Sequence, residues 1–78
     1  MTDTIKAAAK ATDRIRLHVS NALLALEEFR LLSINAHGIL MNPYAQLRDL
    51  EVAHAELGEA LAQHLATSWP NEADYHAL

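Results

Sequence analysis

The chain has 78 residues, a net charge of −4 and no cysteine. A single domain of this size, spanning residues 1–78, buries only about 60% of its unfolded surface, and without disulfides we expect it to gain stability by oligomerising. The negative charge excludes a generic nucleic-acid-binding role, and no uncharged apolar run approaches the roughly 18 residues of a membrane span. Since the N-terminus shows no secretion signal, we expect a cytoplasmic protein.

The first predicted element is a long helix over residues 4–37, which contains neither proline nor glycine. Apolar residues recur along it at spacings of three and four, as on one face of a helix: Ile5, Ala8, Ile15, Val19, Ala22, Leu26 and Phe29. A second stripe, on a different face, has a spacing of seven: Leu17, Leu24 and Leu31, joined by Ile34. One stripe can face a second helix, so the other requires a further partner.

A turn over residues 38–42 separates this helix from the next. Gly38 is suited to the left-handed position that ends a helix. Asn42 is a good N-cap, and Pro43 fits the first position of the helix that follows. A turn this short makes the two helices antiparallel, so the predicted fold is an all-α helical hairpin.

The second predicted helix covers residues 43–68. One of its faces carries large residues and histidines: Leu47, Leu50, His54, Leu57, Leu61 and His64. Beside this face runs a row of small residues: Ala55, Gly58, Ala62 and Ala66. Glycine within a helix costs about 1 kcal/mol relative to alanine, so we expect Gly58 and Ala62 to allow close packing against the first helix. In the predicted register the small row opposes Leu26, Leu23, Val19 and Ile15, and His64 lies level with His18.

The large residues of the second helix are then left without a partner inside one hairpin. Two hairpins packed as a four-helix bundle would bury them, so we expect a homodimer. The residues expected in the dimer or partner interface are Leu17, Leu24, Leu31, Ile34, Leu40, Met41, Leu47, Leu50, Leu57 and Leu61. The tail over residues 69–78 either folds over the longer first helix, through Trp69 and Tyr75, or is loose.

Charge is distributed unevenly along the chain. Residues 1–48 hold all six Lys and Arg against four acids, whereas residues 49–78 hold six acids and no Lys or Arg. In an antiparallel hairpin this asymmetry is self-complementary. The alternative is an acidic surface that steers a basic partner toward the protein.

One pattern suggests metal chemistry. Glu51 and His54 stand three residues apart on one helix face, as in di-iron carboxylate bundles, and a homodimer would supply two such pairs together with two copies of Glu27 or Glu28. Both Glu27 and Glu28, however, are predicted to turn away from the inner face. The simpler interpretation is that the histidines lie at the edge of the interface, each with one hydrogen-bonding neighbour. We find no nucleophile–base set and no phosphate-binding loop, so we expect no enzymatic activity and no cofactor.

The segment Leu50-Glu51-x-Ala53-x-x-x-Leu57-Gly58-Glu59-Ala60-Leu61 resembles the second helix of small phage-encoded helical-hairpin proteins, the quorum-sensing anti-activators of temperate Pseudomonas phages. The resemblance implies a dimeric regulator without enzymatic activity. It also implies binding to a LuxR-type transcription activator, which blocks DNA binding, and in some members binding to a pilus-assembly ATPase. No residue that contacts a partner is carried over from this segment.

These observations favour a regulatory or inhibitory adaptor that acts by binding another protein. The first alternative is a metal-binding bundle that uses Glu51 and His54. The second is a structural subunit of a larger assembly.

Overall fold

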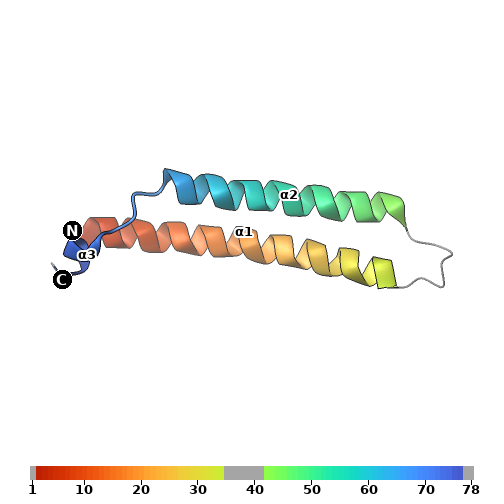
Figure 1. Ribbon diagram of the computed structural model, residues 1–78, viewed down its shortest axis with the longest axis horizontal. Coiled ribbons are helices and arrows are strands. Elements are labelled where there is room, and N and C mark those ends of the chain that lie inside the picture. Colours follow the sequence, from red (N-terminus) through yellow and green to blue (C-terminus); the bar gives the residue numbers. More distant parts are fainter. Residues whose placement is uncertain (1, 35–41, 77–78) are drawn as a thin grey trace.

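The computed structural model describes residues 2–34 and 42–76, apart from the side chains of residues 2, 33 and 34. Two long helices, α1 (Thr2–Ile34) and α2 (Pro43–Ala66), run antiparallel and side by side, and a short helix, α3 (Glu72–His76), follows them (Figure 1). The molecule is a rod with extents of 61 × 17 × 14 Å. The predicted all-α hairpin is therefore confirmed. The predicted last turn of the first helix, Gly38, Leu40 and Met41 lie outside the described residues.

The start of α2 follows the local chemistry that the sequence predicts. Asn42 is the N-cap: its side-chain oxygen accepts a hydrogen bond from the Ala45 amide at 3.0 Å, and its carbonyl accepts one from the Gln46 amide at 3.0 Å. Pro43 occupies the first turn, where a missing N–H removes no helical hydrogen bond. The helix ends at Ala66, two residues before the predicted end, where the Thr67 hydroxyl donates to the Gln63 carbonyl at 2.6 Å.

Small residues form the contact between α1 and α2. The buried apolar residues among those described are all alanines: Ala8, Ala11, Ala22, Ala25, Ala53 and Ala60. Ala22 and Ala25 of α1 form a cluster with Ala53 of α2. Alanine on both helices brings the two backbones close together, but it buries little apolar area for each residue. Consequently, no large apolar side chain among those described is fully buried: Ile15, Val19, Phe29 and Leu32 are partly buried, and most of the others are exposed.

The predicted helix–helix interface is wrong in two respects, the small residues of α2 that form it and the register. Gly58 and Ala62 are exposed, and a Cβ atom added at Gly58 would meet nothing within 4 Å. At 100° per residue Gly58 lies about 140° around the helix from the buried Ala53. The prediction placed small residues of α2 against large residues of α1, whereas the structure places alanine against alanine. The register differs as well, because His18 lies beside Glu56 and not beside His64.

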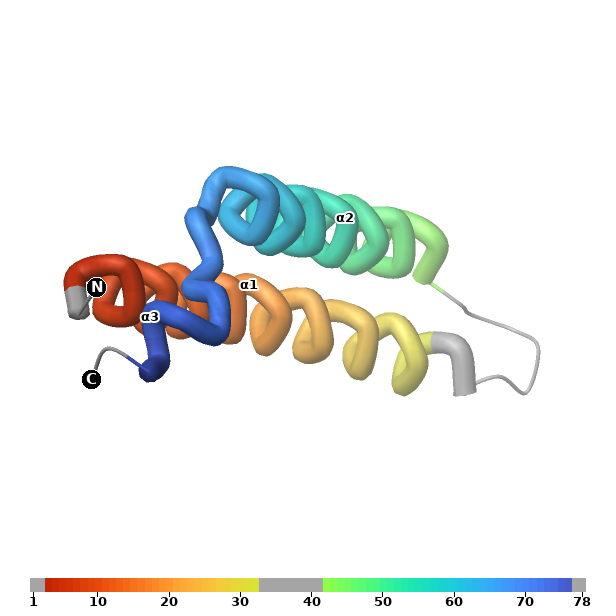
Figure 2. The backbone as a smooth tube through the Cα atoms, turned by 60° about the vertical axis from the view of Figure 1, so that its left-hand side comes forward, coloured from red at the N-terminus to blue at the C-terminus, as the bar shows by residue number. Residues whose placement is uncertain are grey.

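The C-terminal tail folds back onto α1. Asn71 and Asp74 cap α3 reciprocally: the Asn71 amide donates to Asp74 Oδ2 at 2.8 Å, and the Asp74 amide donates to Asn71 Oδ1 at 3.0 Å. This places α3 beside the first turns of α1, beyond the end of α2 (Figure 2). Trp69 stays at the end of α2, where its indole N–H donates to the His64 carbonyl at 3.1 Å.

Candidate functional site

The single chain exposes far more surface than a compact protein of its mass. A compact monomer of 8.6 kDa has an accessible surface of about 4,700 Å². This chain has 6100 Å², an excess of about 1,400 Å² over that scaling. Among the described residues, no side chain larger than alanine is buried except that of Asp49. The candidate functional surfaces are the two faces of the hairpin that flank the alanine contact, because the exposed large side chains lie there.

One of these faces is apolar, and we call it the leucine face. It consists of Leu23 and Leu26 on α1 and of Leu50, Leu57 and Leu61 on α2. All five are exposed, from 38% for Leu26 to 60% for Leu23 and Leu61. At 100° per residue they turn away from the buried alanines on the side opposite to the groove described below, so the two helices present them together.

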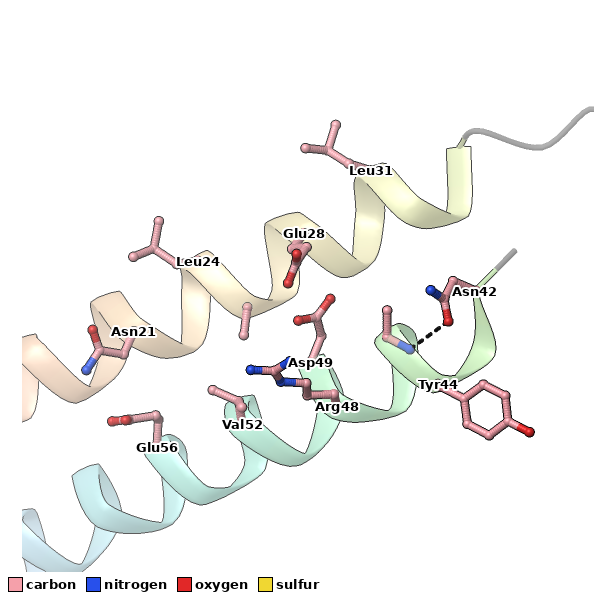
Figure 3. A pocket seen from close by; sticks show the side chains of 12 residues that line it. Asn21, Leu24, Glu28, Leu31, Asn42, Tyr44, Arg48, Asp49, Val52 and Glu56 are labelled. Carbon is pink, nitrogen blue, oxygen red and sulfur yellow. Dashed lines mark hydrogen bonds between the residues drawn. The ribbon is translucent and has the colours of Figure 1, made fainter. Parts of the chain in front are cut away.

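The other face contains a groove of about 850 Å³ between α1 and α2 (Figure 3). Apolar side chains of both helices line it, among them Leu24, Leu31 and Val52. Its polar and charged lining residues are Asn21, Glu28, Asn42, Tyr44, Arg48, Asp49 and Glu56. The groove therefore combines apolar walls with a concentration of carboxylates.

Asp49 is the unusual residue of this groove. It is only 4% exposed, and its Oδ2 atom has no hydrogen-bond partner among the described residues. The Glu28 carboxylate points toward it from α1 (Figure 3). The hydrogen-bonding contact with Asp49 and the repulsion between the two carboxylates raise the pKa of Glu28. Two carboxylates facing each other across a helix–helix interface oppose its packing.

A second polar contact between the helices is attractive, in contrast to the pair of carboxylates. His18 Nδ1 lies 2.5 Å from Glu56 Oε2, and both side chains are about three-quarters buried. This hydrogen bond lowers the pKa of Glu56. The pair fixes the register of α2 against α1.

The predicted interface residues are divided between the two faces. Leu24 and Leu31 line the groove, whereas Leu50, Leu57 and Leu61 lie on the leucine face. Leu17 and Leu47 are also exposed, at 60% and 54%. The side chains of Ile34, Leu40 and Met41 are not among those described. The structure thus exposes every predicted interface residue whose side chain it describes.

The residues of the metal hypothesis do not converge within one chain. Glu51 and His54 are exposed on α2. The Glu27 carboxylate instead accepts two hydrogen bonds from Arg30, at 2.7 and 3.0 Å, and this contact lowers the pKa of Glu27. In the part of the chain that the structure describes, no three His, Asp or Glu residues are grouped so that they could hold a metal ion.

Sequence reasoning missed the groove and Asp49. A signal was available, because Asp49 stands four residues before Ala53 and seven before Glu56, at the helical spacing of one face.

Within the described ranges, neither long helix is apolar enough to cross a membrane. Comparison with known proteins identifies no relative: no family model matches the chain, and neither curated proteins nor solved structures give a match.

Proposed function

We propose that this protein is a non-enzymatic protein-binding module that acts as a homodimer. The observation that supports it is the exposed apolar surface: the single chain buries alanines and leaves most of its described leucines exposed. Obligate homodimers bury about 2,000 Å² or more in total, and the surface excess of about 1,400 Å² per chain leaves room for an interface of that size. Two hairpins joined through their leucine faces would form a four-helix bundle.

The dimer leaves the groove face free for another protein. Leu17, Leu24 and Leu31 lie on that side of α1 and are exposed by 55% or more. A contiguous apolar stripe of this kind is typical of a binding surface. The role we infer is that of a regulatory or inhibitory adaptor. The resemblance of residues 50–61 to phage-encoded quorum-sensing anti-activators favours a LuxR-type transcription activator as the target.

The two faces can be tested separately with matched leucine variants. Leu57→Asp places a carboxylate in the leucine face, where burial of an unpaired charge costs several kcal/mol. We expect it to weaken dimerisation by at least about a hundredfold, measured by analytical ultracentrifugation. Leu24→Asp makes the same change on the groove face and should leave the dimer intact. A wild-type protein that sediments as a stable, fully helical monomer would contradict the proposed assembly.

The target is tested with a purified LuxR-type activator and its operator DNA. Wild-type protein should reduce the activator–DNA complex in a gel-shift assay, and Leu24→Asp should not, although it remains dimeric. If Leu24→Asp inhibits as well as wild type does, the groove face is not the target-binding surface.

A further inference from the structure

The groove holds more negative charge than its own residues neutralise. Glu28, Asp49 and Glu56 contribute three carboxylates, against one cation from Arg48. Glu56 already has a partner, because it accepts a hydrogen bond from His18. The ion pairs within the described part of the chain do not include Arg48, and none involves Glu28 or Asp49. Within the described residues, the facing carboxylates of Glu28 and Asp49 thus form no ion pair, and the attraction of Glu28 to Arg48 is weaker than its repulsion from Asp49.

Asp49 differs from an ordinary surface acid. Only 4% of its surface is exposed, its Oδ2 atom has no hydrogen-bond partner among the described residues, and it lines the groove opposite Glu28. A buried carboxylate with an unsatisfied oxygen atom is costly, and such an atom in a native structure calls for an explanation, which a function can supply. Alanine at this position would continue the alanine contact of Ala53 and Ala60 without that cost. The carboxylate therefore points to a ligand that supplies the missing positive charge.

We propose that the groove binds an arginine side chain presented by a helix of the partner protein. This inference rests on the proposed function as a protein-binding module. A guanidinium group carries five donors in a planar fork, which suits the two carboxylates of Glu28 and Asp49. It is also more weakly hydrated than a lysine ammonium, so it loses less solvation between apolar walls such as Leu24 and Val52.

The dimensions of the groove suit a helical segment. On α1 its lining residues extend from Asn21 to Leu31, which corresponds to about 15 Å at 1.5 Å per residue. Two to three turns of a partner helix fit this length, with apolar side chains against Leu24 and Leu31 and the arginine between them. The partner segment is therefore an amphipathic helix with one arginine on its apolar face.

The arginine site can be tested without knowing the partner. The probe is N-acetyl-arginine methylamide, added to the ¹³C-labelled full-length protein at neutral pH while NMR follows the side-chain carboxyl signals. The control probe is the citrulline analogue, which has a similar shape but no charge. With the arginine probe we expect saturable shifts of the Glu28 and Asp49 carboxyl signals. The citrulline probe should bind with at least about tenfold lower affinity.

Three variants decide the assignment. Asp49→Asn should weaken arginine binding at least about tenfold. Glu51→Gln removes an exposed acid elsewhere on α2 and should leave binding unchanged. Arg48→Gln should strengthen binding, because it removes the cation that competes from within the groove. A third probe, N-acetyl-lysine methylamide, tests the preference for a guanidinium group. Equal effects of Asp49→Asn and Glu51→Gln, equal binding of arginine and citrulline, or tighter binding of the lysine probe would each overturn the proposal.

Sedimentation of the same samples separates this inference from the proposed function. If wild type is dimeric but does not bind arginine selectively, the arginine site is refuted and the dimeric module stands. If arginine binds through Asp49 while the protein is monomeric, the arginine site stands and the dimer is refuted.

Discussion

The replacement Asp49→Ala should stabilise the protein. Asp49 is 4% exposed with an unpartnered Oδ2 atom, and leaving a buried polar group unsatisfied costs about 1–3 kcal/mol. Alanine removes that group and extends the alanine contact of Ala53 and Ala60. It also has the higher helix propensity, by up to about 0.7 kcal/mol. We therefore expect the free energy of unfolding to rise by about 1–3 kcal/mol. For a chain of this size, each kcal/mol raises the Tm by roughly 4–8 °C.

The matched control is Asp13→Ala. Asp13 is exposed within α1 and lies 3.9 Å from Arg16, so its replacement changes helix propensity and one weak surface ion pair. Thermal unfolding followed by circular dichroism, at one fixed protein concentration, compares the two variants. The structural reasoning is refuted if Asp49→Ala melts below wild type, or if it gains no more than Asp13→Ala does.

The pH dependence supplies an independent check of the same site. Asp49 raises the pKa of Glu28 above the ordinary value of 4.5, so the folded protein binds this proton more readily than the unfolded chain. This effect makes wild type gain stability as the pH falls from the raised pKa toward 4.5. The advantage of Asp49→Ala over wild type should therefore shrink over that interval, and an advantage that grows instead would contradict the carboxylate pair.

Three further substitutions test other contacts by thermal unfolding. Gly58→Ala should stabilise the protein by up to about 1 kcal/mol, because the added Cβ meets open space, and a loss of stability would mean that Gly58 is packed against another chain. Asn42→Ala removes the hydrogen bond to the Ala45 amide and should cost about 1 kcal/mol, whereas an unchanged Tm would show that this cap is dispensable. Glu56→Gln removes the partner of His18. That contact lowers the pKa of Glu56, so it stabilises the folded protein fully above pH 4.5 and less as the pH falls through the lowered pKa. The variant lacks this contribution and should therefore lose less stability in acid than wild type does.

The features that depend on local chemistry could be predicted from the sequence. The absence of proline and glycine from residues 4–34 predicts the first long helix, and Asn42 with Pro43 predicts where α2 begins. A cap is a contact between residues three apart, so it can be identified without knowledge of the fold. The periodicity also identified correctly that Leu50 and Leu57 of α2 are left uncovered within one chain, although it did not single out Val52 and Leu65, which are exposed as well.

Which small residues of α2 contact α1 could not be predicted, because it depends on how the two helices pack. Two rows were available, one through Gly58 and Ala62 and one through Ala53 and Ala60, and periodicity favours neither. The choice depends on the surface that α1 presents, since Ala22 and Ala25 leave room for alanine in the opposite helix. The same choice buries Asp49 opposite Glu28 and so creates the acidic groove. The energetic effect of a charged residue depends on the residue that faces it, and here that residue lies about twenty positions away in the chain.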